Sequence, residues 1–275
     1  MKFRHAVHRR SHLAPPSVKP WNLTAILLVT LQIGCGTAPD LESAREFQDV
    51  ESAFAAAATS DEFSRVAARY DQLQSSGLVS GVVFFNQGNA WMRAGHPGRA
   101  IAAWRQAQRY RPRDPYLKAN LENALNKCGS TSPLALDDGV AGYLFFWQDW
   151  LSYPEKFLLT SVFLLTMCLI SLAGRFAVSD TLRKRLTVCS GVLCVLVALS
   201  CVRDWQRFDR TIHGVVIQAG VEARKGNSET YEPAFTEPLS AGAEFVVLEQ
   251  RADWCNIQLH ELGTAWVQAR DVVIY

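Results

Sequence analysis

The sequence has 275 residues, of which 28 are Lys or Arg and 26 are Asp or Glu, so the formal net charge at pH 7 is only +2. This length suits one large domain or two small ones, and the near balance of charge argues against a nucleic-acid-binding protein. Charged residues are 20% and hydrophobic residues 49% of the chain, which excludes a disordered chain, a collagen-like repeat and a small disulfide-rich protein.

The N-terminal 38 residues have the pattern of an export signal. An apolar run over residues 23–33 follows five basic residues and no acidic ones. Eleven residues are too few to cross a bilayer but suit the apolar part of a secretory signal. Small residues surround Cys35 after this run, an arrangement similar to a lipoprotein signal with Cys35 as the lipidated residue. We expect residues 1–38 to be a signal peptide or an N-terminal membrane anchor.

Residues 40–127 predict a helical repeat. The segment 86–90 (NQGNA) recurs after 34 residues as 120–124 (NLENA). Between the copies, apolar residues at spacings of i, i+4 and i+7 describe two amphipathic helices. Asp114 followed by Pro115 marks the start of a third helix.

The segment 81–114 resembles a tetratricopeptide repeat. Small and aromatic residues occupy the signature positions of that family, namely Gly88, Trp91, Gly95, Ala100, Trp104, Ala107 and Pro112. Apolar residues 34 positions earlier predict a degenerate repeat over 47–80, and a third half-repeat is expected over 115–127.

The resemblance implies a concave face that accepts an extended or helical peptide. The residues that the family register places on this face are Phe85, Asn89, Met92, Arg93 and Asn123. Asn side chains hold a peptide backbone well, because each offers hydrogen-bond donors and acceptors. The alternative is that these Asn residues only cap or bridge neighbouring helices.

Two windows after the repeat, 157–174 and 186–202, contain no charged residue. Each is about 26 Å long at a rise of ~1.5 Å per residue, close to the ~30 Å hydrocarbon core of a bilayer. The residues flanking the windows include aromatic side chains typical of a membrane interface, namely Trp147, Trp150, Tyr153 and Trp205. We expect two transmembrane helices after a linker over 128–156; the alternative is a buried hairpin in a soluble protein.

The segment 175–185 between the two windows carries four basic residues and one acid, so the positive-inside tendency predicts a cytoplasmic loop. An exported N-terminus gives the same orientation, because the first spanning helix then enters from outside. Both flanking modules are therefore expected in the periplasm, on the outer face of a bacterial inner (cytoplasmic) membrane.

Residues 212–275 change to short β-rich runs separated by Gly and Pro. Five strands are expected, over 215–217, 244–248, 254–259, 265–267 and 272–274. Five short strands in about 60 residues suggest a small barrel, and the order of apolar residues resembles a bacterial SH3-like domain. Such domains bind peptides or glycan-linked peptides through exposed aromatic residues. The candidates are Tyr231, Phe235 and Trp254; the alternative for Trp254 is a place in the core.

The charges of these modules are opposite. Residues 81–127 carry eight basic and two acidic side chains, and residues 212–275 carry four basic and nine acidic ones. Because a helical hairpin returns the chain to the same membrane face, we hypothesise that the acidic module docks on the basic repeat and occludes its groove. The alternative is that the acidic segment 40–80 already neutralises the basic repeat.

No phosphate-binding loop, nucleophile elbow or zinc-protease motif occurs in the sequence. We therefore expect no catalytic residue, no cofactor and no metal site. Four cysteines lie within the apolar windows, namely Cys168, Cys189, Cys194 and Cys201. In such segments cysteine commonly behaves as a small apolar residue. The alternative is a membrane redox protein that uses these cysteines. Cys128 and Cys255 lie in different modules, and an oxidising periplasm would permit a disulfide between them.

The order of signal, tetratricopeptide-type repeats, two-helix transmembrane hairpin and SH3-like barrel resembles the BatE-like family of the bacterial Bat aerotolerance system. The resemblance implies a non-enzymatic inner-membrane scaffold that works beside von Willebrand A-type membrane proteins and a MoxR-type ATPase. The alternative function is a cell-wall tethering protein whose SH3-like domain binds peptidoglycan.

Overall fold

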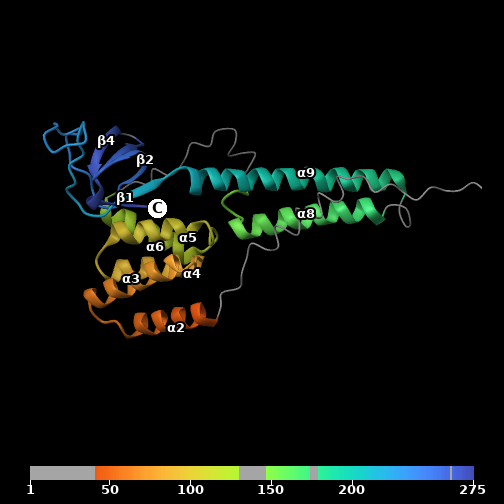
Figure 1. Cartoon of the computed structure of the whole chain (residues 1–275), viewed down its shortest axis with the longest axis horizontal. Coiled ribbons are helices and arrows are strands. Elements are labelled where there is room, and N and C mark those ends of the chain that lie inside the picture. Colours follow the sequence, from red (N-terminus) through yellow and green to blue (C-terminus); the bar gives the residue numbers. More distant parts are fainter. Residues whose placement is uncertain (1–40, 130–146, 174–178, 261) are drawn as a thin grey trace, which may run out of the picture.

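The computed structural model describes residues 41–129, 147–173, 179–260 and 262–275. Within these residues the chain forms seven α-helices and one small antiparallel sheet, arranged as a helical array, a long helical hairpin and the sheet (Figure 1). The expected signal segment 1–38, with Cys35, lies outside the described residues.

The helical array contains five consecutive helices. They are α2 (Leu41–Ala56), α3 (Ser60–Ser75), α4 (Gly81–Arg93), α5 (Pro97–Gln108) and α6 (Pro115–Cys128). The loops between them begin helices with side-chain caps: Thr59 and Glu62 form a capping box at α3, and the Asp114 carboxylate accepts hydrogen bonds from the first turn of α6. The helices predicted over 81–114 and 115–127 are therefore present, with two earlier helices before them.

The pair α4 and α5 is held by a small residue against a large one. A Cβ atom added at Gly88 would overlap the indole ring of Trp104, and Trp104 is only 1% exposed. The indole Nε1 donates a hydrogen bond to the carbonyl of Phe85 at 3.2 Å. The two helices approach closely because the missing side chain at Gly88 leaves room for the ring.

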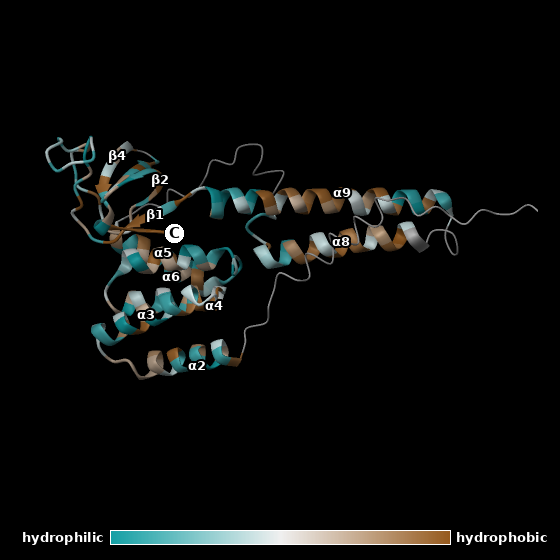
Figure 2. Ribbon diagram, in the orientation of Figure 1, coloured by the Kyte–Doolittle hydropathy of each residue, from teal (hydrophilic) through white to brown (hydrophobic). Residues whose placement is uncertain are grey.

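The hairpin consists of α8 (Tyr153–Ala173) and α9 (Asp180–Trp205), which lie side by side (Figure 1). Both helices are long and apolar enough to cross a membrane, and Figure 2 shows hydrophobic residues along their central parts. The helix α9 begins at Asp180, inside the segment expected as a loop. An ion pair between Asp180 and Arg183 at 2.9 Å lies in its first turn.

The sheet has the strand order β4-β3-β2-β1-β5, and every neighbouring pair is antiparallel. The strands are β1 (His213–Val216), β2 (Glu244–Arg251), β3 (Trp254–Leu259), β4 (Gly263–Gln268) and β5 (Val272–Ile274). All five predicted strands are confirmed. The final strand β5 returns to pair with β1, which places Tyr275 next to His213 at the edge of the sheet.

The sheet docks on the helical array mainly through β1 and β5 against α5. A Cβ atom added at Gly98 of α5 would lie 2.5 Å from the carbonyl oxygen of Val216, so the backbones are in close contact. The expected docking of the two modules is therefore present. It is centred on α5, however, whereas four of the five candidate groove residues lie on α4 and Asn123 lies on α6. The expectation that the sheet covers that face has no support in these contacts.

Candidate functional site at the junction of the three modules

The candidate groove residues of the repeat lie between α4 and α6. Phe85, Asn89 and Met92 are half-buried, and Arg93 and Asn123 are exposed. The amide of Asn120 donates to the side-chain oxygen of Asn89 at 3.1 Å. Asn89 thus bridges two helices, which is the structural role that the sequence left open for it.

Two of these candidates also contact neighbouring aromatic or basic residues. The guanidinium of Arg93 lies over the rings of Phe54 and Phe63, at 5.0 and 5.2 Å from their centroids. The guanidinium of Arg111 lies 4.8 Å from the centroid of the Phe85 ring. These contacts order the side chains of Arg93 and Phe85, and Asn123 is an exposed polar group of the set.

The three aromatic candidates of the sheet module do not share one pocket. Trp254 is half-buried and lines an open hollow of about 660 Å³ together with charged residues such as Glu229 and Arg270. The exposed ring of Tyr231 lies over Gly226. Phe235 is half-buried and packs against the core of the sheet.

A site not expected from the sequence lies where the array, the hairpin and the sheet meet. Its centre is an ion pair between Arg105 of α5 and Glu244 of β2. The Nε and Nη2 atoms of Arg105 donate to the two carboxylate oxygens of Glu244 at 2.5 and 2.7 Å, and the side chains are 10% and 1% exposed. This two-point geometry fixes the sheet on the array.

The hairpin joins the array through Arg109, one turn after Arg105. Its Nη1 and Nη2 atoms donate to the carboxylate of Asp209 at 2.9 and 2.7 Å, and its carbonyl accepts from the backbone N–H of Tyr153 at 3.1 Å. Burial acts to lower the pKa of Arg109, but the hydrogen bonds and charge of Asp209 outweigh it and raise that pKa. Arg109 is therefore a fixed cation that contacts the start of α8 and the chain that follows α9.

Asp209 is presented by an irregular turn. Immediately after α9, the chain forms a single π-helical turn, η1 (Gln206–Arg210). Such turns are rare and occur frequently at functional sites. The turn carries Arg207, whose carbonyl lies 3.0 Å from Nε2 of His213.

His213 and Tyr275 form the sheet side of the junction. Their rings stack with centroids 6.1 Å apart. Burial lowers the pKa of His213, and the charges of Arg207 and Arg105 act in the same direction. The hydrogen bond to the Arg207 carbonyl and the charge of Glu244 oppose this shift without reversing it. Burial and the charge of Glu244 raise the pKa of Tyr275 well above its ordinary value. At neutral pH both rings are therefore uncharged.

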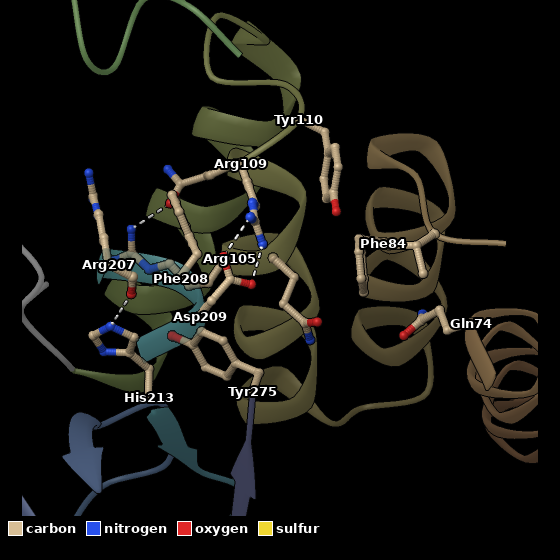
Figure 3. A pocket seen from close by; sticks show the side chains of 13 residues that line it. Gln74, Phe84, Arg105, Arg109, Tyr110, Arg207, Phe208, Asp209, His213 and Tyr275 are labelled. Atoms are coloured by element: carbon tan, nitrogen blue, oxygen red, sulfur yellow. Dashed lines mark hydrogen bonds and ion pairs between the residues drawn. The ribbon is translucent and has the colours of Figure 1, made fainter. Parts of the chain in front are cut away.

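These residues enclose a cavity of about 370 Å³, shown in Figure 3. All three modules contribute to its lining. The lining residues are Gln74, Val79, Phe84, Arg105, Gln106, Gln108, Arg109, Tyr110, Arg207, Phe208, Asp209, His213 and Tyr275. The cavity combines aromatic walls with polar groups, as small-molecule sites commonly do.

A second buried polar cluster lies at the base of the hairpin. The Lys156 ammonium donates to the Asp204 carboxylate at 2.8 Å and to the Gln148 carbonyl at 2.7 Å. The Gln148 amide also donates to Asp204, and the Ser200 hydroxyl donates to the amide oxygen of Gln148 at 2.6 Å. The two charged residues lie just outside the apolar windows and clamp α8 to α9.

The cysteines form no disulfide among the residues described. Cys128 and Cys255 are free thiols, and burial raises the pKa of each. The four cysteines of the hairpin are also free. In the described ranges no group of three or more His, Cys, Asp and Glu side chains is placed to hold a metal ion.

The sequence contains one signal that points to the junction. Gly98, Ile101, Ala102 and Arg105 follow the i, i+3, i+4, i+7 spacing of one helix face, so a cation ends an otherwise apolar stripe. Nothing in the sequence around Asp209, His213 or Tyr275 marks them as members of the same site.

No known protein family matches the sequence, and neither a curated protein nor a solved structure matches it.

Proposed function

We propose that the chain is a non-enzymatic scaffold of the bacterial inner membrane, with the helical array and the sheet as its two protein-binding modules. The observation that carries the proposal is their common position: both lie at the same end of the α8–α9 hairpin (Figure 1). The buried pair of Arg105 and Glu244 holds them as one unit there. A hairpin that crosses the membrane would expose this unit on a single face.

The module types support a binding role. Gly88 and Trp104 occupy signature positions of the tetratricopeptide repeat that the sequence resembles, and these two residues pack closely on each other. The sheet has five strands, the number expected of an SH3-like domain. Together with the hairpin, these features favour a BatE-like protein of a Bat-type complex, with von Willebrand A-type membrane proteins and a MoxR-type ATPase system as partners. The basic segment 175–185 supports a periplasmic orientation of both modules.

Protease accessibility in bacterial cells that express the full chain tests this proposal. With the outer membrane opened, both modules should be cleaved by an added protease while the cytoplasmic membrane is intact. A module that is protected until the cytoplasmic membrane is lysed would refute the proposed topology. A photo-crosslinker at Asn123 should then capture a co-expressed von Willebrand A-type partner, and one at the exposed Glu237 of the sheet module serves as the control position.

A second candidate function is cell-wall tethering. The specific observation in its favour is the open, polar hollow of about 660 Å³ beside Trp254, since an aromatic ring next to charged groups suits a glycan-linked peptide. In sedimentation with isolated peptidoglycan, the full chain in detergent should then co-sediment, Trp254→Ala should not, and Tyr231→Ala should behave as wild type. Full-chain protein that stays in the supernatant would dismiss this function.

A further inference from the structure

Three buried polar atoms around the junction cavity have no hydrogen-bond partner among the described residues. They are Nε of Arg109, Nδ1 of His213 and the hydroxyl oxygen of Tyr275. His213 is only 6% exposed, and Figure 3 shows the three side chains around the same cavity. Buried polar groups in folded proteins are almost always paired, so the cavity is suited to a group that pairs with these atoms.

The chemistry of that group follows from the three atoms. The Arg207 carbonyl can only accept, so Nε2 of His213, 3.0 Å away, carries the hydrogen. The uncharged ring therefore presents Nδ1 as an acceptor. Nε of Arg109 is a donor, and the Tyr275 hydroxyl can donate as well. The cavity thus offers one acceptor and two donors.

A hydroxyl group is complementary to this set, because it has one proton to donate and two lone pairs to accept. A carboxylate has no proton for Nδ1 of His213, and an ammonium has no lone pair for the two donors. The nearby cations are also already matched, Arg105 by Glu244 and Arg109 by Asp209. The cavity therefore favours an uncharged ligand over an ion.

The walls indicate the rest of the ligand. The aromatic rings of Phe84, Tyr110 and Phe208 line the cavity beside Tyr275, and the Phe84 and Tyr110 rings stack at 6.1 Å. A volume of about 370 Å³ is at the lower end of small-molecule sites, which run from about 300 to 1,000 Å³. Aromatic walls of this kind accept a flat, apolar ring.

We propose that the junction cavity binds a small phenolic ligand, whose hydroxyl pairs with unpartnered polar atoms of the cavity wall, the Tyr275 hydroxyl among them. The source is either a water-soluble phenol or the quinol headgroup of a membrane lipid, since Phe208 follows directly on the hairpin. No electron transfer is part of this proposal. The site does not depend on the scaffold function proposed above.

Fluorine NMR with the full chain in lipid nanodiscs tests the site. The probes are 4-fluorophenol, fluorobenzene, which lacks the hydroxyl, and 4-fluorobenzoate, which carries a charge. We expect 4-fluorophenol to bind about three- to tenfold more tightly than either of the others, as one to two hydrogen bonds would give. Equal binding of 4-fluorophenol and fluorobenzene, or no binding of the phenol, would overturn the proposal.

Variants locate the site. Tyr275→Phe removes only an unpaired hydroxyl, so the protein should fold with unchanged stability, bind 4-fluorophenol about three- to tenfold more weakly and bind fluorobenzene as before. Tyr116→Phe, on α6 and 74% exposed, is the matched control and should change nothing. Unchanged affinity in Tyr275→Phe would refute the site, and lowered stability with unchanged affinity would assign the hydroxyl to a buried water instead.

The same binding assay separates the two sources. A short-chain hydroquinone incorporated in the nanodisc should displace 4-fluorophenol if the ligand comes from the lipid, and should leave it bound if the site takes only phenols from water. Either result supports the phenolic site and identifies how its ligand enters.

Discussion

Arg105 and Glu244 are 139 residues apart in the chain and form a two-point ion pair that is almost fully removed from water. The pair joins the basic helical array to the acidic sheet module. Removing charges from water is unfavourable, and their attraction offsets this only when the geometry is good and both partners are present. The pair therefore specifies where the modules meet more than it adds net stability.

Removing one partner should consequently be far more harmful than removing both. We expect Arg105→Ala to lower the free energy of unfolding by about 3–5 kcal/mol, because it leaves the Glu244 carboxylate buried and unpaired. The double variant Arg105→Met with Glu244→Met should recover much of this loss. Thermal unfolding of the full chain in detergent, followed by circular dichroism, measures both.

The matched control for this prediction is Arg251→Ala. Arg251 pairs with Glu249 on the same sheet module, but both side chains are exposed, so no measurable change is expected. If Arg105→Ala were as stable as Arg251→Ala, the pair would not hold the two modules together.

The close approach of α4 and α5 makes a second prediction. Gly88→Ala should destabilise the array by about 1–3 kcal/mol, because the added methyl group overlaps the buried Trp104 ring. Gly191→Ala in α9 is the control: its Cβ would meet only the Met167 sulfur at 3.6 Å, an ordinary contact. The unfolding temperature of Gly88→Ala should therefore be lower than that of Gly191→Ala. Equal unfolding temperatures of the two variants would mean that Trp104 moves aside freely.

The elements of this fold could be predicted because hydrophobic periodicity and capping depend on neighbours in the sequence. Asp114 and Pro115 mark the start of α6, and the five β-rich runs mark the five strands. The Gly88 and Trp104 pair was also visible as part of a repeat pattern. These features are local, so one sequence is enough to find them.

The junction could not be predicted in the same way. Arg109 pairs with Asp209 across 100 residues, and this contact depends on how the hairpin returns to the array. The overall charges of the two modules predicted docking, but the sheet meets α5 and not the groove that was expected to be covered. Net charge does not distinguish Arg105 from the other cations of the segment. The π-helical turn that presents Asp209 has no pattern of its own.

A third prediction concerns pH. Burial lowers the pKa of His213 from its ordinary value of 6.5, so the unfolded chain binds a proton more readily than the folded one. The contribution of His213 to stability is therefore complete above pH 6.5 and is lost as pH falls below that value. Between pH 7.5 and 5.5 the unfolding temperature of the wild type should fall more than that of His213→Gln.

The control for this titration is His96→Gln, at an exposed position of the array. This variant should keep the pH dependence of the wild type. Carboxylates with a lowered pKa, such as Glu62 at its helix cap, keep their full contribution to stability above pH 4.5 and lose it only below that value, outside this window. Parallel pH profiles for the wild type and His213→Gln would show that the junction tolerates a charged imidazole.

The last prediction concerns the clamp at the base of the hairpin. Lys156 and Asp204 are 1% and 5% exposed and pair at 2.8 Å, with the Gln148 amide bound to the same carboxylate. Lys156→Met leaves that carboxylate buried without its cation, so we expect a loss of about 3–5 kcal/mol in unfolding measured in detergent. Adding Asp204→Asn should restore most of it, because a neutral amide can still pair with Gln148.

The opposite end of the same hairpin supplies the control. Arg183 pairs with Asp180, which is 79% exposed, so Arg183→Met should leave the unfolding temperature unchanged. Since η1 begins two residues after Asp204 and carries Asp209, loss of the clamp should also expose the segment around Asp209 to proteolysis. Full stability of Lys156→Met with an intact protease pattern would mean that α8 and α9 are held together by their apolar faces alone.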